Sequence, residues 1–240
     1  MLQSSGAILD RDILPVITCS GFGTSEPLTL WSFEGTGFLL EKNIFVTCWH
    51  FVRTPLREGR EYAVVVETDE GNTAWMLSDI SKDANGTDLA TVRVPLEPNL
   101  GLVLAHEPVL MGADVWTFGY PLTRGPYPLS EEDPARGKRI ELEGRYLRGY
   151  VTRTVKYEDP HFGETPCYEL DMPAPAGLSG APIVERGSKR VIGVVFKEHY
   201  RGDSEEYSRT TFALAHYTET LLNLRGSATL GLTLPEYLDG

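Results

Sequence analysis

Cysteine is scarce in this chain, which carries only Cys19, Cys48 and Cys167 in 240 residues. An odd and sparse set does not build the paired framework of a small disulfide-stapled secreted domain. We therefore expect reduced thiols, which suit a cytoplasmic protein.

Long apolar runs are also missing, and no window approaches the length of unbroken apolar sequence that a membrane span requires. Near the N-terminus, Asp10, Arg11 and Asp12 interrupt the one weakly apolar stretch. No basic segment precedes an apolar run there, so the sequence predicts no secretory signal. We expect no membrane partner.

Basic residues are outnumbered, with 22 Lys and Arg against 34 Asp and Glu and a formal net charge of -12. Such a surface repels phosphate backbones, so nucleic acid is not an expected partner. The chain is nevertheless 41% hydrophobic, which is enough for a packed core and argues against disorder.

What the chain does have is a series of short strand-like runs, separated by many of its 24 glycines and 16 prolines. Regular short strands with turn signals predict an all-β sandwich or barrels rather than alternating β-α units. The runs are 37–40, 44–47, 62–66, 89–94, 114–118, 146–155, 183–184 and 191–195.

Other segments interrupt this strand pattern. A helix is predicted near the end, where Tyr217, Leu221 and Leu224 follow helical spacing before the stop signal at Arg225-Gly226. Two polar stretches, Pro121 to Lys138 and Lys197 to Ser208, predict exposed loops.

The segment Pro175-Ala-Gly-Leu-Ser-Gly-Ala-Pro-Ile-Val184 carries the most chemical information. Acyl transfer needs a nucleophile on a tight turn beside backbone N–H groups that bind the developing oxyanion. Gly177 permits such a turn, and Gly180 leaves no side chain beside Ser179. A Gly-Ser turn also occurs by chance between ordinary strands, so this motif needs partners elsewhere.

His50 is the best candidate for a general base. It follows a predicted hairpin of two strands joined by a polar turn at Glu41-Lys-Asn43. That setting places an imidazole at the rim of a rigid sheet. The other four histidines lie in turn-like or polar segments and are given no role: His106, His161, His199 and His216.

The third group must be a carboxylate that orients the imidazole and stabilises its charged form. Asp88 opens the apolar run to Val94, directly after the turn Asn85-Gly86-Thr87, where burial begins. It could instead cap that turn, a common use of aspartate. Asp83 is the competitor, but its polar surroundings predict a solvated side chain.

Together these segments resemble the signature blocks of the trypsin-like (chymotrypsin-fold) serine proteases. Gly35-Thr-Gly-Phe38 with Val46-Thr-Cys-Trp-His-Phe-Val52 resembles the histidine block, and Asp88-Leu-Ala90 the aspartate block. Gly177-Leu-Ser-Gly-Ala-Pro182 resembles the serine block. Phe212-Ala-Leu-Ala215, followed by a helix, resembles the end of the bacterial high-temperature-requirement branch. The likeness is co-linear from about residue 33 to residue 224.

The resemblance implies two six-stranded antiparallel Greek-key β-barrels with a short C-terminal helix. It places one barrel in residues 1–112 with His50 and Asp88. The second barrel, with Ser179, then occupies 113–226, and 227–240 is a tail. The implied activity is peptide-bond hydrolysis by a Ser-His-Asp triad through an acyl-enzyme, on protein or peptide substrates and without a cofactor.

The family's chemistry also implies an oxyanion hole at the N–H groups of Gly177 and Ser179. The residues expected to line the substrate pocket are Pro173, Ala174, Phe196, Lys197 and Glu198. Leu178 and Pro173 stand where digestive members carry aspartates. Neither N-terminal activation nor trypsin's preference for Lys or Arg is therefore expected, and regulation by a partner protein is a hypothesis.

Other chemistries fit the sequence less well. An α/β-hydrolase would carry a glycine where Ala181 stands and would place its acid and histidine after the serine. A cysteine nucleophile at Cys167 would need a glycine-framed oxyanion turn, which the neighbouring residues do not offer. Cys48 and His50 share a strand face, but no second ligand pair follows, so no metal site is expected. A catalytically silent protease-like binding module stays open as the second interpretation.

Overall fold

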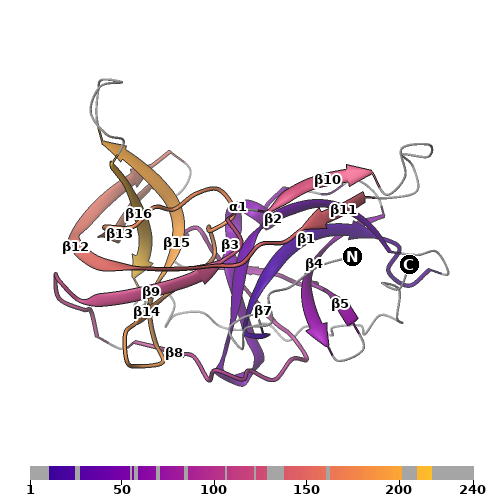
Figure 1. The fold of residues 1–240 in the computed structure, drawn as a ribbon, viewed down its shortest axis with the longest axis horizontal. Helices are drawn as coiled ribbons and strands as arrows, with labels where there is room; N and C mark the ends of the chain where they lie inside the picture. The colour runs from indigo at the N-terminus through magenta and orange to yellow at the C-terminus, as the bar shows by residue number, and fades with distance from the viewer. Residues whose placement is uncertain are drawn as a thin grey trace.

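The structure is a computed structural model built almost entirely of β-strands (Figure 1). Among the residues that it describes, the one α-helix is the single turn α1 (Trp49–Val52), and no helix is long and apolar enough to cross a membrane. The described residues are 11–24, 28–54, 56, 59–68, 71–83, 86–105, 107–121, 123–128, 138–160, 163–201 and 210–217.

The first sheet follows the path β5-β4-β1-β2-β3-β7-β6. Its two end strands are consecutive in the chain and separated only by residues 77–80, so the sheet curls back on itself. The hairpin β10–β11 is added to β2 through the pair Lys138 and Leu30. The strands are β1 (Ile13–Ser20), β2 (Thr29–Leu40), β3 (Ile44–Cys48), β4 (Arg60–Thr68), β5 (Gly71–Met76), β6 (Ser81–Lys82), β7 (Leu89–Arg93), β10 (Arg124–Pro128) and β11 (Lys138–Glu141).

The second sheet closes into a ring. Its path β14-β9-β12-β13-β16-β15 is completed by pairing between β14 and β15, and β8 lies outside the ring, parallel to β15. Closure leaves no free edge along these six strands. The strands are β8 (Val103–Leu104), β9 (Asp114–Gly119), β12 (Arg145–Asp159), β13 (Gly163–Leu170), β14 (Pro182–Glu185), β15 (Arg190–Arg201) and β16 (Thr210–Tyr217).

The predicted fold class of two antiparallel β-barrels is confirmed. The sheets hold nine and seven strands. The second sheet has the expected ring of six strands plus β8, whereas the first has seven strands along its path plus the hairpin β10–β11. The predicted strand runs all lie within strands, apart from Val94, which directly follows β7. The predicted boundary near residue 112 remains a prediction, and the tail 227–240 lies outside the described residues.

Two local predictions need correction. Residues 124–128 form β10 and Lys138 begins β11, although Pro121 to Lys138 was expected to be a loop. Proline and glycine are tolerated at a sheet edge, so composition alone hides this hairpin. Residues 197–201 likewise extend β15. Tyr217 ends β16, and the rest of the predicted helix lies outside the described residues.

An apolar layer joins the two sheets. Phe38 and Val46 of the first sheet pack in one buried cluster with Val184, Val191 and Val194 of the second. In Figure 1 the first sheet lies mainly to the right and the second to the left, with α1 near their boundary. Burial of this layer fixes the relative position of loops that project from both sheets.

A fully buried carboxylate ties the connection between the sheets to the start of β1. Asp12 is 0% exposed, and its side chain accepts the N–H of Asn99 at 2.7 Å and the N–H of Leu100. Its own carbonyl accepts the N–H of Leu39 at 2.7 Å. Asp12 therefore fixes the connecting backbone at Asn99 and Leu100 against the start of β1.

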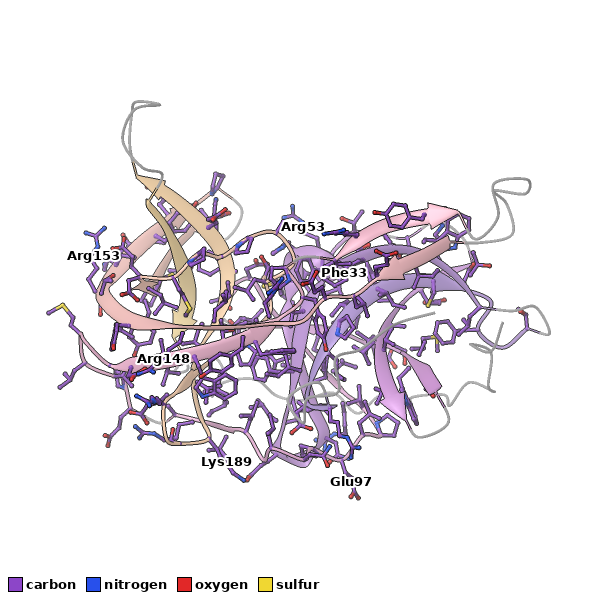
Figure 2. All side chains as sticks on the ribbon, viewed as in Figure 1. Phe33, Arg53, Glu97, Arg148, Arg153 and Lys189 are labelled. Atoms are coloured by element: carbon purple, nitrogen blue, oxygen red, sulfur yellow. The ribbon has the colours of Figure 1, made fainter. Side chains whose placement is uncertain are left out.

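We expect Asp12→Ala to lower the free energy of unfolding by about 3 kcal/mol, because two backbone N–H groups lose their charged acceptor and a buried side chain is truncated. Urea denaturation measures this change. The control is Glu97→Ala, an exposed acidic residue of the same connection (Figure 2), which should change stability by less than about 0.5 kcal/mol. Equal effects of the two variants would show that other contacts hold the connection.

Candidate active site

The predicted nucleophile lies on a tight turn. The N–H of Leu178 donates to the carbonyl of Pro175 at 3.0 Å, and Gly177 has φ +96° at the third position of this turn. Ala176 is not among the residues with positive φ, so the turn has the pattern of a type II turn, which requires glycine at that position. Leu178 is 0% exposed and packs in the core of the second sheet. Burial of Leu178 anchors the turn that presents Ser179.

Thr36 of β2 fastens this turn to the first sheet. Its N–H donates to the carbonyl of Ser179 at 3.0 Å, and its hydroxyl donates to the carbonyl of Gly177 at 2.7 Å. Its own carbonyl accepts the hydroxyl of Thr47 at 2.7 Å. All polar groups of Thr36 are thus engaged where the two sheets meet.

Gly180 is required by the same contact. A Cβ built on it would lie 1.8 Å from the carbonyl oxygen of Thr36, and its φ is +86°. Gly177 is similarly enclosed, because a Cβ there would lie 2.9 Å from the ring of Phe33, which Figure 2 labels near the centre of the molecule. Both glycines permit a close approach of backbone that any side chain would prevent.

His50 and Asp88 are brought together by adjacent strands. β3 pairs with β7 so that Cys48 lies opposite Leu89, which places the residues beyond these strand ends side by side. The imidazole Nδ1 lies 2.5 Å from Oδ2 of Asp88, and the His50 N–H donates to Oδ1 at 2.7 Å. Because a carboxylate only accepts hydrogen bonds, Nδ1 carries the proton and Nε2 is left as the basic nitrogen.

The pair differs sharply in exposure. The side chain of His50 is 31% exposed, whereas that of Asp88 is 2% exposed. The N–H of Trp49 adds a hydrogen bond to the carbonyl of Asp88 at 3.1 Å. The buried carboxylate of Asp88 thus accepts two hydrogen bonds, both from His50, whereas the imidazole is partly exposed to solvent.

The serine turn and the histidine segment converge on β15. The carbonyl of Val195 accepts the N–H of Gly180 at 2.6 Å and the thiol of Cys48 at 3.4 Å. The ring of Phe51 and the carbonyl of Ser179 also lie against the same side of Gly35. Segments far apart in the sequence therefore meet around Ser179 and His50.

The serine hydroxyl itself is only loosely held. It donates to the carbonyl of Phe196 at 3.4 Å, which is long for a hydroxyl donor. The ladder of β15 and β16 shifts register at this residue, between Val195 and Lys197. Such bulges commonly redirect backbone groups beside active sites.

The residues predicted to line the pocket occupy different environments. Ala174 and Phe196 are buried, Glu198 is partly buried, and Pro173 and Lys197 are exposed. The Lys197 ammonium lies 3.7 Å from a carboxylate oxygen of Asp159 and 4.8 Å from the ring centroid of Tyr157. Its charge is therefore directed toward β12.

The structure corrects the expectation for Asp83 and adds Thr36 to the residues around the site. Asp83 is 3% exposed and therefore not solvated. It accepts a hydrogen bond from the hydroxyl of Thr87 at 2.6 Å, so Asp83, and not Asp88, caps the turn before β7. Thr36 was missed, although it lies between the two glycines of the quoted histidine block. For Cys48 the sequence predicts no metal site, because no second ligand pair follows it and His50. Its Sγ and ligand atoms of His50 and Asp88 in fact all lie within 4.8 Å of one another.

Two curled antiparallel sheets, with a serine turn from one fastened through Thr36 to the sheet that carries a His-Asp pair, are typical of the chymotrypsin-like class of folds. The chain belongs to the trypsin-like peptidase domain family, which it matches over residues 35–194. That span contains His50, Asp88 and Ser179. The predicted resemblance to the trypsin-like serine proteases is therefore confirmed.

Two curated relatives come from Mycobacterium tuberculosis. They are the serine protease Rv3671c of strain ATCC 25618 / H37Rv and the serine protease MT3772 of strain CDC 1551 / Oshkosh. Each is 31% identical over 164 residues, which make up 68% of this chain and 36% of the relative. The chain thus spans little more than a third of the length of these relatives.

Solved structures share the fold at low identity. The active form of the Rv3671c protease has a TM-score of 0.54 at 20% identity, covering 89% of this chain and 78% of that one. The MamO protease domain from Magnetospirillum magneticum scores 0.59 at 15%, covering 88% and 94%. The HtrA-type protease AlgW with a decapeptide scores 0.59 at 14%, covering 92% and 66%.

The contact between Gly180 and Thr36 gives a stability prediction. We expect Gly180→Ala to lower the free energy of unfolding by at least about 3 kcal/mol, because backbone must move and left-handed φ is strained. The control Gly187→Ala has φ +76° but open space around its Cβ, so it should cost only about 1 kcal/mol. Urea denaturation of both variants tests this difference, which is contradicted if the two losses are equal.

The three thiols should resist alkylation. Burial raises the pKa of Cys19 and of Cys167 to about 12, and burial together with the charge of Asp88 raises the pKa of Cys48. Since only the thiolate reacts, iodoacetamide at pH 8 should modify the folded chain more than roughly a hundredfold slower than the same chain in denaturant. Peptide mass spectrometry measures each site, and a cysteine that reacts equally fast in both states would contradict its burial.

Proposed function

We propose that this protein is a serine endopeptidase in which Ser179, His50 and Asp88 form the catalytic triad. One observation supports the proposal most: Nδ1 of His50 lies 2.5 Å from Asp88 on the same sheet to which Thr36 fastens the glycine-framed turn of Ser179. Membership of the trypsin-like peptidase domain family supports the same assignment.

In this mechanism the Ser179 hydroxyl attacks a peptide carbonyl while Nε2 of His50 takes its proton. Asp88 holds the imidazole in the required tautomer and stabilises the imidazolium that forms. His50 then gives the proton to the leaving amine, and an acyl-enzyme remains on Ser179. Water activated by His50 hydrolyses this ester and returns the serine.

The N–H groups of Gly177 and Ser179 are proposed to bind the oxyanion. Among the described residues neither N–H has a hydrogen-bond acceptor, although both lie in a turn whose other groups are engaged. Free donors beside a nucleophile, fixed before the substrate arrives, are what stabilises a developing oxyanion. The positive φ of Gly177 supports this role because it fixes the orientation of the adjacent peptide.

Proteins or peptides are the proposed substrates, and no cofactor is needed for this chemistry. The fold relative AlgW has a decapeptide in its structure, which supports a peptide ligand for this architecture. We further propose that Pro173, Ala174, Phe196, Lys197 and Glu198 line the substrate pocket. Lys197 contributes mainly its stem there, because its ammonium is directed toward Asp159.

Two finer proposals concern the setting of the enzyme. All three cysteines are free, which supports a reducing compartment such as the cytoplasm. Regulation by a partner protein stays a prediction. Leu178 supports a mode of activation that differs from that of the digestive enzymes, because an apolar side chain, and not a carboxylate, anchors the serine turn.

Replacement of the nucleophile tests the proposal. Ser179→Ala should lower peptidase turnover by roughly ten thousand-fold or more while the fold is retained, because no other group can form the acyl-enzyme. Cleavage of a denatured protein substrate, followed by mass spectrometry, provides the measurement. Ser188→Ala, in the turn between β14 and β15, is the matched control and should keep parental turnover.

A serine-directed fluorophosphonate separates this function from a catalytically silent binding module. The parent should be labelled at Ser179, and His50→Ala should greatly reduce that labelling because the hydroxyl loses its base. A folded parent that neither reacts with the probe nor cleaves any peptide would establish the silent module instead.

A further inference from the structure

We propose that Cys48, His50 and Asp88 form a binding site for Zn²⁺, and that occupation of this site switches the peptidase off. The metal site rests on geometry alone, whereas its inhibitory consequence rests on the proposed function. None of the three residues needs to be recruited from elsewhere, because the fold already brings them together.

The spacing of the donor atoms fits a small divalent ion. Sγ of Cys48 and ligand atoms of His50 and Asp88 all lie within 4.8 Å of one another. Ligands at the usual zinc distances of 2.0–2.3 Å stand about 3.5 Å apart in a tetrahedron. The thiol therefore has to approach slightly, and the His50–Asp88 contact of 2.5 Å has to open slightly.

The types of donor select the metal. A thiolate, an imidazole and a carboxylate suit Zn²⁺, whereas Mg²⁺ and Ca²⁺ prefer a shell made of oxygen atoms. Two anionic ligands would balance the charge of the ion. Three protein ligands also leave a fourth position, which water can occupy.

Access runs along the imidazole. Cys48 is fully buried, but the side chain of His50 is 31% exposed, so an ion reaches the thiol past this ring, whereas a bulkier alkylating reagent is excluded. The thiol makes a long 3.4 Å contact with the carbonyl of Val195 and a hydrogen bond with the backbone of Gly180. A metal ion deprotonates a coordinating thiol outright, so the protonated resting state of Cys48 does not prevent binding.

Zinc binding changes the protonation of Cys48 and His50. The thiol of Cys48 releases one proton to solvent as its sulfur binds the ion. Nδ1 of His50 exchanges its proton for the metal, and the neutral imidazole then carries its proton on Nε2. Nε2 can no longer accept the proton of Ser179, so the nucleophile is not activated.

Titration of peptidase activity with Zn²⁺ tests the inhibitory effect. We expect reversible inhibition that a chelator relieves, with a half-inhibitory concentration raised by at least about tenfold in Cys48→Ser. The serine hydroxyl can still donate to Val195 but is a poor zinc ligand. Cys167→Ser is the matched control, because Cys167 also donates to a backbone carbonyl, that of Thr165 at 3.3 Å. It should keep the parental zinc response.

Equal inhibition of the parent and of Cys48→Ser would overturn the proposed ligand set, and an active parent that Zn²⁺ does not inhibit would overturn the switch. Each variant is compared with itself in the presence and absence of zinc, so a change in its basal turnover does not affect the result.

Direct binding is measured on Ser179→Ala, which keeps all three ligands. Co²⁺ serves as a spectroscopic substitute for zinc, and a thiolate-to-cobalt charge-transfer absorption should appear with one ion per chain. The absorption should be lost in Ser179→Ala/Cys48→Ser and kept in Ser179→Ala/Cys167→Ser. Its absence from folded Ser179→Ala would overturn the site.

The two experiments also separate this inference from the proposed function. If the absorption appears but the parent cleaves no peptide, the metal site stands and the peptidase assignment fails. If the parent cleaves peptides but shows neither absorption nor inhibition, only the metal site fails.

Discussion

The approach of Gly180 to the Thr36 carbonyl is the contact on which the rest of the site depends. Each sheet can bury its own core, but the serine turn belongs to one sheet and the histidine segment to the other. Thr36 joins them by donating to the carbonyls of Gly177 and Ser179 while its own carbonyl accepts from Thr47. A side chain at position 180 would occupy the space of that carbonyl and push the sheets apart at the nucleophile.

The His50–Asp88 pair depends on a second constraint, the register of β3 and β7. A buried carboxylate is unfavourable unless its oxygens find donors. Here the backbone N–H and the ring of His50 supply them, and both come from the same residue. A shift of register by one residue would separate the pair and turn each strand's core face outward. Core packing therefore enforces the same register that the proposed catalysis needs.

Much of this arrangement could be predicted from the sequence, because its signals are local. The glycines around Ser179, the hairpin before His50 and the apolar run after Asp88 each lie within a few residues of the group that they position. Pairings between distant segments carry no comparable local signal. Composition predicts a loop over residues 121–138, although residues 124–128 form β10 and Lys138 begins β11, which pairs with β2. Asp83 was misjudged for the same reason, since burial of a polar turn depends on what packs over it.

Leu178 shows how a family site can be kept while one of its supports changes. Where digestive relatives place an aspartate before the serine, this chain buries a leucine among the apolar residues of the second sheet. Burial of a leucine contributes about 1.5–3 kcal/mol, which suffices to hold a short turn against its alternatives. The support also differs in kind, because an ion pair is made or broken by one partner, whereas a packed side chain moves only when its core moves. The conformation of the serine turn is therefore coupled to the packing of the second sheet through Leu178, and to the first sheet through the hydrogen bonds of Thr36.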